Sequence, residues 1–218
     1  MGALILWGLM DSPFVRRVAV ALSHYCMDWE RRPLSVFRDA EAMRRVSPLG
    51  RAPVLALANG RMLTDSRTIL EWLDEEVAPE RRLTPEDDGQ RLDMLEIEAV
   101  ALGAAELAVE HSGERLRRAV PDVARIGLLE ERIAAALDWL DGHGRGGPLV
   151  GDRISRADLA LGCFATYMAE KAPRLWGARH RLYAHRAWAE AQPAFLAAPF
   201  SIDEARATGW RDEVEERS

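Results

Sequence analysis

Short apolar runs alternate with amphipathic stretches over the first eighty residues of the chain. Residues 3–7 form an apolar run typical of a buried strand, and residues 13–25 carry apolar side chains at helical spacing. Residues 30–36 predict a second strand, and residues 39–46 predict a short helix. Two further strands flank an Asn-Gly pair, which is a strong hairpin signal, and another helical stripe follows them. The pattern therefore predicts strand–helix–strand followed by strand–strand–helix.

The pattern changes at residues 77–88, where prolines and charged residues replace the apolar positions. Such a stretch is typical of a linker. Beyond it the apolar spacing is helical almost to the end of the chain. We therefore expect an α/β domain at residues 1–79 and an all-helical domain at residues 86–218. A chain of 218 residues with 48% hydrophobic content can bury cores of this size.

Composition and charge narrow the class of protein. A net charge of −6 argues against a nucleic-acid-binding protein, which would usually be basic. Nothing at the N-terminus resembles a signal peptide and no apolar run is long enough to span a bilayer, so a cytoplasmic protein without a membrane partner is expected. Cys26 and Cys163 lie in helical patterns and are expected to be buried and reduced. No clustered His and Cys spacing predicts a metal site.

Ser12 precedes a proline at the junction of the first strand and the first helix, and two roles are open to it. Its oxygen can cap the helix, with the proline at the first helical position. Alternatively, its hydroxyl can donate to a ligand thiolate. Lowering a thiol pKa from about 8.5 by about two units needs roughly 2.7 kcal/mol. A hydrogen bond to a charged group contributes about 1.5–3 kcal/mol and a helix N-terminus about 0.3–2 kcal/mol, which together suffice.

Pro53, Val54 and the Asp65–Ser66 pair extend this hypothesis to a peptide ligand. A cis bond at Pro53 would turn the backbone of Val54 outward, where its N–H and C=O could pair with an extended peptide. Asp65 and Ser66 open the next helix, which they either cap or use to bind an amino-acid end. In the second case Ser66 meets the carboxylate and Asp65 faces the ammonium. Together these positions predict a groove for an extended, thiol-bearing, anionic peptide.

Four motifs, read in order, resemble those of a known family: SPFVRRV, SPLGRAPVL, LTDSRTILEWLDE and GDRISRADLAL. They are similar to those of the cytosolic glutathione S-transferases, of the serine type common in bacteria. The resemblance implies a thioredoxin-like N-terminal domain, an all-helical C-terminal domain and a homodimer. It also implies that glutathione binds across the first domain and that an apolar second substrate binds against the helices.

The resemblance assigns the sulfur end of glutathione to the first motif. Ser12 would hydrogen-bond the sulfur, and Phe14 would line that end of the site. Pro53 would be the cis-proline, and the backbone of Val54 would clamp the cysteinyl unit. Related thiol-disulfide proteins carry two cysteines where this chain has Ser12 and Val15, so disulfide exchange at this place is excluded.

The same resemblance assigns the two ends of the tripeptide. Asp65 and Ser66 would hold the γ-glutamyl unit. The glycyl carboxylate would meet Arg51 or Arg38, and the resemblance does not choose between them. Glutathione enters as a co-substrate, and no metal is implied.

The predicted function is that of a glutathione transferase in detoxification, which transfers glutathione to a small electrophile and has peroxide reduction as a further activity. Two alternatives stay open. One is a non-catalytic binding or regulatory protein of the same fold, similar to the stringent-starvation proteins. The other is a glutathione-dependent dehalogenase or lyase. The hydroxyl at Ser12 together with Asp65–Ser66 favours the enzyme over the regulatory protein.

Several polar residues of the helical region are expected to serve the scaffold. Ser155 and Asp158 have the spacing of a capping box and should stabilise a helix rather than catalyse. Glu98 belongs to an acidic set that is expected to face solvent along the first long helix. His111, near the end of that helix, is expected at the surface or at a helix cap.

Overall fold

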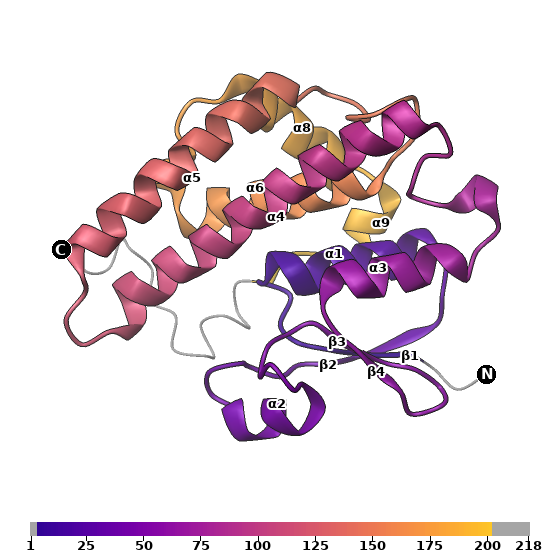
Figure 1. Ribbon diagram of the computed structural model, residues 1–218, viewed down its shortest axis with the longest axis horizontal. Helices are drawn as coiled ribbons and strands as arrows, with labels where there is room; N and C mark the ends of the chain where they lie inside the picture. The colour runs from indigo at the N-terminus through magenta and orange to yellow at the C-terminus, as the bar shows by residue number, and fades with distance from the viewer. Residues whose placement is uncertain (1–3, 202–218) are drawn as a thin grey trace. The chain divides into compact units, whose positions relative to one another are not determined.

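A computed structural model describes residues 4–201 of the protein, apart from the side chain of Leu116. These residues divide into two compact units, which Figure 1 shows as an α/β part and a helical part. The units comprise residues 4–84 with 191–201, and residues 85–190.

A four-stranded sheet forms the centre of the first unit, in the order β2-β1-β3-β4. Its strands are β1 (Leu4–Trp7), β2 (Trp29–Arg32), β3 (Val54–Ala56) and β4 (Met62–Leu63). β1 runs parallel to β2 and antiparallel to β3, and β3 is antiparallel to β4. The predicted α/β class and order of elements are confirmed. β2 ends before residue 36 because Pro33 has no N–H with which to continue the ladder.

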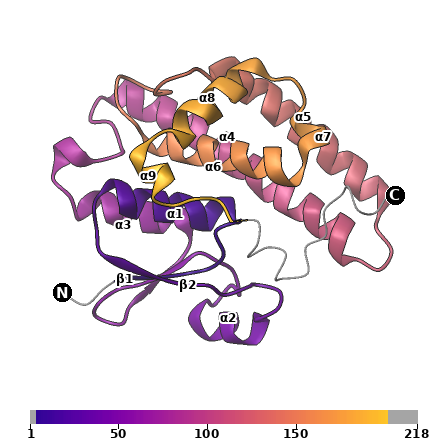
Figure 2. The same cartoon turned by 180° about the vertical axis from the view of Figure 1, so that it is seen from behind.

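Two helices cover one face of this sheet. Figures 1 and 2 show α1 (Pro13–His24) and α3 (Ser66–Glu75) side by side, with α2 (Ala40–Val46) outside their layer. The inward faces of α1 and α3 are apolar and fully or almost fully buried, with Val15, Val18, Leu22, Ile69, Leu70 and Leu73 among their residues. Burial of each such side chain contributes roughly 1.5–3 kcal/mol, so the helical stripes seen in the sequence provide the core of this unit.

Gly8 connects β1 to α1 in a conformation that only glycine adopts readily. Its φ is +135°, and a Cβ at this position would lie 2.5 Å from a methyl group of Val15 and 3.0 Å from the Cβ of Ala52. The absence of a side chain thus lets the turn before α1 approach the segment before β3. This close approach brings the surroundings of Ser12 and Pro53 together.

The short helix α9 (Pro193–Leu196) belongs to the first unit, although the sequence predicted one helical domain over residues 86–218. Nε of Arg16, on α1, donates to the carbonyl oxygen of Ala198 at 2.9 Å, and its guanidinium lies 5.4 Å from the ring centre of Phe195. A buried arginine needs such acceptors, and the returning chain supplies one. Residues 202–218 of the predicted domain lie outside the described residues.

The segment expected as a linker is anchored to the first unit by Asp74. The buried carboxylate of Asp74 accepts hydrogen bonds from the hydroxyls of Tyr25 and Thr84 and, at 2.9 Å, from the N–H of Leu83. The chain before these residues forms a single 3-10 turn, η1 (Pro79–Arg81). The boundary between the two units falls between Thr84 and Pro85, inside the segment expected as a linker.

The second unit consists of helices, as the sequence predicted. They are α4 (Asp88–Arg117), α5 (Val123–His143), α6 (Arg156–Lys171), α7 (Pro173–Trp176) and α8 (His180–Glu190). α4 packs against both α5 and α6, and α6 packs against α8. Almost every residue of α6 is buried, which makes it the central helix of this unit.

Two polar residues of α4 are buried, whereas the sequence predicted them at the surface. Glu98 is buried, and its carboxylate accepts two hydrogen bonds from Arg156 of α6, at 3.2 and 3.0 Å. His111 is also buried, with Nε2 3.0 Å from a carboxylate oxygen of Glu130 on α5. Both predictions of a solvent-facing side chain were therefore wrong, because the partners come from other helices.

The two cysteines differ in environment. Cys163 is buried in α6, as expected. Cys26 is exposed and has a φ of +55°, because it follows the end of α1 rather than lying within the helix. The prediction of a buried thiol was wrong for Cys26. Neither cysteine is in a disulfide.

Candidate functional site

Three backbone segments meet at one end of the sheet in the first unit. β1 ends there and leads into α1, β3 begins there after Pro53, and α3 begins there after β4 (Figure 1). The hydroxyl of Thr64, which precedes α3, donates to the carbonyl oxygen of Pro53 at 3.2 Å. Together with the approach of Gly8 to Ala52, this bond brings Ser12, Val54 and Ser66, which lie far apart in the sequence, to the same end of the sheet.

Ser12 is the N-cap of α1 and is partly exposed. Its oxygen accepts a long hydrogen bond, 3.4 Å, from the N–H of Val15, and Pro13 occupies the first helical position. A serine hydroxyl has one hydrogen to donate and two acceptor positions, so the cap leaves the hydrogen available. The first turn of α1 contains no acidic residue, and the positive pole of the helix lies beside Ser12. The two roles open to Ser12 in the sequence are thus compatible.

Phe14 lies in the first turn of α1 and is half-buried. It follows Ser12 by two residues, so a partly exposed aromatic residue lies in the turn that the serine caps.

The segment around Pro53 leads directly into β3. The Ala52–Pro53 peptide bond is cis, and Pro53 and Val54 are both buried. On one side Val54 lies opposite Trp7 of β1, whereas the pairing of β3 with β4 covers only Leu55 and Ala56. The backbone of Val54 is therefore not paired with β4.

Asp65 and Ser66 lie at the start of α3. One oxygen of Asp65, Oδ1, accepts from the N–H groups of Arg67 at 2.9 Å and Thr68 at 3.4 Å, so Asp65 is the N-cap. Ser66 is the first helical residue and is almost fully buried. Both hydrogen bonds of Asp65 use the same oxygen, so capping and an outward-facing carboxylate oxygen can coexist.

The two predicted arginines differ in what they touch. The guanidinium of Arg38 donates to both carboxylate oxygens of Asp39, at 3.3 and 3.2 Å. This contact, followed by a hydrogen bond from the N–H of Ser35, holds the pKa of Asp39 below its ordinary value. Arg51 is exposed, and within residues 4–201 no carboxylate pairs with its guanidinium.

Arg67 is a further candidate site residue that the sequence analysis did not include. It is exposed in the first turn of α3, directly after Ser66, and no acidic side chain of the described residues pairs with it. A cation is disfavoured beside the positive pole of a helix unless an anion is present there. Its place in the sequence, directly after the residues that cap and begin the helix, already carried this signal.

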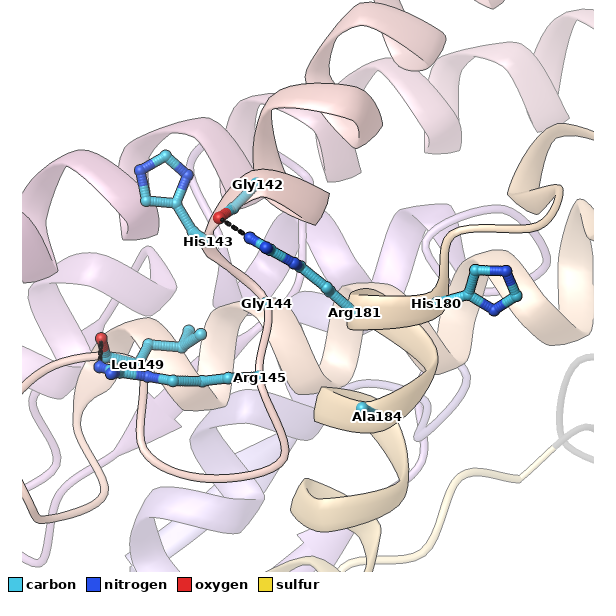
Figure 3. A pocket seen from close by; sticks show the side chains of 8 residues that line it. All are labelled: Gly142, His143, Gly144, Arg145, Leu149, His180, Arg181 and Ala184. Atoms are coloured by element: carbon cyan, nitrogen blue, oxygen red, sulfur yellow. Dashed lines mark hydrogen bonds between the residues drawn. The ribbon is translucent and has the colours of Figure 1, made fainter.

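A separate cavity of about 600 Å³ lies in the second unit, between the end of α5 and the start of α8 (Figure 3). Its basic side chains point apart rather than toward one another. Arg181 donates to the carbonyl oxygen of Gly142 at 2.9 Å, and Arg145 donates to that of Leu149. Because both guanidinium groups hold backbone, we assign this cavity no ligand.

A buried acid–base pair lies in the same unit. The carboxylate of Asp158 accepts from the N–H and the hydroxyl of Ser155, both at 2.7 Å, and from the N–H of Leu149 at 2.8 Å. Burial raises the pKa of Asp158 in spite of these bonds. Burial also lowers the pKa of His185 below its ordinary value, although the neighbouring Asp158 charge opposes the effect. Neither residue is exposed to solvent, so the pair has a structural role.

Neither a metal-binding cluster nor a membrane-spanning helix occurs among the described residues. No three His, Cys, Asp or Glu side chains within residues 4–201 come together to hold a metal ion. No helix in that part of the chain is both long enough and apolar enough to cross a bilayer.

Comparisons with known proteins place the chain among glutathione S-transferase-like sequences and folds. Residues 6–81 match the family described as glutathione S-transferase, N-terminal domain. An uncharacterized GST-like protein of Escherichia coli (strain K12), YibF, is 29% identical over 165 residues, which cover 75% of this chain and 81% of that protein.

Similar solved structures extend over almost the whole chain. A glutathione S-transferase from Methylobacterium radiotolerans, in complex with glutathione sulfonate, is 28% identical with a TM-score of 0.83, covering 92% of this chain and 96% of that chain. A glutathione S-transferase from Methylobacillus flagellatus KT, with GSH bound, is also 28% identical with a TM-score of 0.83. That match covers 91% of this chain and 100% of the other.

Proposed function

From the premise that the chain belongs to the cytosolic glutathione S-transferase superfamily, we propose that it binds glutathione, holds the sulfur as a thiolate through Ser12, and transfers it to a small electrophile. The observation that carries this proposal is that Ser12 is partly exposed at the N-terminus of α1, with its hydroxyl hydrogen not used by the cap. Its hydrogen is left to donate, and the thiolate is the nucleophilic form of the tripeptide.

The free energy needed to keep the glutathione sulfur ionised matches what Ser12 and the N-terminus of α1 can contribute. Lowering the thiol pKa by about two units corresponds to roughly 2.7 kcal/mol. A charge-assisted hydrogen bond from Ser12 contributes about 1.5–3 kcal/mol, and the pole of α1 about 0.3–2 kcal/mol. No general base is therefore needed. In the transfer step the thiolate sulfur forms a bond to the electrophilic carbon, and the leaving group departs with the electron pair of the bond that breaks.

The remaining contacts hold the tripeptide in place. The backbone of Val54, at the start of β3, pairs with the cysteinyl unit by strand addition. The α-carboxylate of the γ-glutamyl unit meets the hydroxyl of Ser66 and the first N–H groups of α3, and its ammonium faces the free oxygen of Asp65. Phe14 lines the sulfur end.

Between the two arginines, Arg51 is the better partner for the glycyl carboxylate. Its guanidinium has no carboxylate partner among residues 4–201, whereas Arg38 already holds Asp39 in a bidentate pair. Arg51→Gln should weaken glutathione binding about tenfold, which corresponds to about 1.4 kcal/mol, and Arg38→Gln should weaken it less. Glutathione esterified at the glycyl carboxylate should bind the Arg51 variant and the original protein equally well.

The proposal is tested directly by titration calorimetry with glutathione, followed by measurement of the ultraviolet absorbance of the bound thiolate over a pH series. We expect binding and a bound thiol pKa about two units below that of free glutathione. S-methylglutathione, which has no thiol, is the control for the absorbance. Absence of binding would refute the proposal, and binding with an unshifted thiol pKa would leave a glutathione-binding protein without this chemistry.

We place this activity in a homodimer in the cytoplasm. Two leucines of α4, Leu92 and Leu95, are 67% and 45% exposed and share one face of the helix. Adjacent apolar side chains left in solvent mark an association surface. Cys26 and Cys163 are not in a disulfide, which fits a reducing compartment. Sedimentation at micromolar concentration should give a dimer, and Leu92→Glu together with Leu95→Glu should give a monomer. A monomer before substitution would refute the dimer.

A further inference from the structure

The charges of the chain are unevenly distributed. Residues 31–51 contain six arginines and two acidic residues, a net charge of +4. The rest of the chain contains 23 basic and 33 acidic residues, a net charge of −10. One short segment therefore has the sign opposite to that of the protein.

This basic segment, residues 31–51, lies at the end of the sheet that carries the candidate site. Arg32 is opposite Trp7 at the end of β1, and its carbonyl oxygen accepts from the N–H of Gly8 at 3.2 Å. α2 follows with Arg44 and Arg45, both exposed. In Figures 1 and 2, α2 lies at the same end of the unit as the starts of α1 and α3. The positive poles of those two helices add to the field of the arginines.

The opposite end of the first unit is acidic. α3 runs from the candidate site to the far end of the sheet, where Glu75, Glu76 and Glu80 are all exposed (Figure 1). Glu75 pairs with Arg82 at 3.1 Å. Residues 75–82 contain three acidic and two basic residues, a net charge of −1, against +4 for the basic segment at the candidate site.

We propose that the basic segment guides anionic glutathione to the site and raises its association rate. The inference rests on the proposed function. Glutathione carries two carboxylates and one ammonium at neutral pH, so it bears a net negative charge and is repelled by a protein of net charge −6. A local field of opposite sign concentrates an anion and accelerates its association. Such a field extends about 8 Å at physiological ionic strength, and therefore it weakens as salt is added.

Arg44 and Arg45 are the residues with which to separate guidance from binding. Neither belongs to the residues assigned to glutathione. Arg45 pairs with Glu41 one turn earlier on α2, with both side chains about three-quarters exposed, so that pair contributes little to stability. Arg44 is exposed on the same short helix, and its substitution removes charge without a buried contact.

The test is stopped-flow association of glutathione, followed by tryptophan fluorescence, with the double variant Arg44→Gln and Arg45→Gln. At low ionic strength we expect the association rate constant to fall about two- to fivefold while the dissociation rate constant stays unchanged. The difference should shrink as salt is raised toward about 1 M, where the screening length is about 3 Å. A matched control, Arg132→Gln with Arg174→Gln, removes the same charge from exposed positions in α5 and α7 and should leave both rate constants unchanged.

The outcomes separate this inference from the proposed function. If the unaltered protein does not bind glutathione, both are overturned. If it binds glutathione but the association rate constant is insensitive to salt and to the double variant, only the guidance is overturned. An equal fall in the control variant would also overturn it, because the effect would then belong to total charge. Circular dichroism and thermal melting establish that both double variants are folded.

Discussion

Ser12 and Ser155 each precede the first turn of a helix, α1 in the first unit and α6 in the second. Ser155 is buried, and its hydroxyl donates to Asp158 at 2.7 Å. Ser12 is partly exposed, and no acidic residue follows it in the first turn of α1. The same residue type at the same helical position is therefore engaged as a donor in one unit and available as a donor in the other. The difference is the presence of a carboxylate three residues later.

The contrast extends to the surroundings of the two serines. In the second unit, the buried carboxylates of Glu98 and Asp158 meet Arg156 and Leu149. In the first unit, Ser12 before α1 and Thr64 before α3 are partly exposed at one end of the sheet, and Asp65 is exposed. A polar group that is already satisfied stabilises the fold, whereas one that is exposed and preorganised can serve a ligand.

The largest change in stability is expected from Asp158→Ala, which removes the carboxylate that accepts from Ser155 in the second unit. The N–H groups of Leu149 and Ser155 and the hydroxyl of Ser155 would be left buried without this partner. Each unsatisfied group costs about 1–3 kcal/mol, so the free energy of unfolding should fall by about 3–5 kcal/mol in urea titrations. The exposed Asp152→Ala is the control and should change it by less than about 0.5 kcal/mol. A loss below 1 kcal/mol for Asp158→Ala would show that the carboxylate does not hold this turn.

Ser12→Ala should affect chemistry more than stability. Loss of the hydrogen bond to the thiolate, worth about 1.5–3 kcal/mol, should lower kcat/KM toward a chlorinated nitroaromatic electrophile about 10- to 150-fold, while the pole of α1 remains. Ser12→Thr keeps a hydroxyl and should retain most of the activity. If Ser12→Ala turns over as fast as the original protein, Ser12 has no part in the reaction and is a cap only.

The buried His185 of the second unit should make the stability of the protein depend on pH. Burial lowers the pKa of His185 in the folded protein below its ordinary value of 6.5, so the unfolded chain binds a proton at a higher pH than the folded one. Stability should therefore fall as the pH decreases from about 6.5, by at most about 1.4 kcal/mol per pH unit from this group. Above about 6.5 neither state is protonated there, and no effect is expected.

Urea titrations between pH 7.5 and 5.5 measure this slope. His185→Phe should reduce it, and His143→Gln, at an exposed position, should leave it unchanged. The raised pKa of Asp158 acts in the opposite sense, since the folded carboxyl takes up its proton at a higher pH than the unfolded one and so gains stability as the pH falls further. An equal slope in the His185 variant would show that other groups carry the acid response.

Ser155→Ala is expected to have the smallest effect. Loss of the capping serine should lower the free energy of unfolding by about 1 kcal/mol, because the N–H of Ser155 still donates to Asp158. The kcat/KM of the folded variant should equal that of the original protein. A fall in kcat/KM comparable to that of Ser12→Ala would mean that the two serines do not differ in role as proposed.

Much of the fold followed from signals that act within three or four residues. The Asn-Gly pair predicted the hairpin that β3 and β4 form, with the N–H of Leu57 donating to Arg61 across it at 2.8 Å. Ser12 before Pro13, Asp65 before Ser66 and Ser155 before Asp158 each lie where a helix begins. Caps depend on neighbouring residues, and therefore the sequence alone was sufficient to place them.

Partners that are distant in the sequence could not be predicted in this way. Glu98 and His111 looked like surface residues on α4 until α6 and α5 supplied Arg156 and Glu130. Likewise, nothing in the spacing indicated that α9 returns to the first unit to give Arg16 an acceptor. Hydrophobic periodicity marks a face as polar or apolar, but it does not say which charged side chain another helix brings to it.

By itself, the sequence determined the order of the strands and helices of residues 4–75 and the starts of α1, α3 and α6. The tertiary structure alone decided which of their polar groups are already in use. Ser155 and Ser12 are the same residue in similar local contexts, yet packing encloses one beside Asp158 and leaves the other partly open to solvent. Burial and long-range hydrogen bonding depend on the whole chain, and they distinguish a residue that holds the fold from one that is free to act.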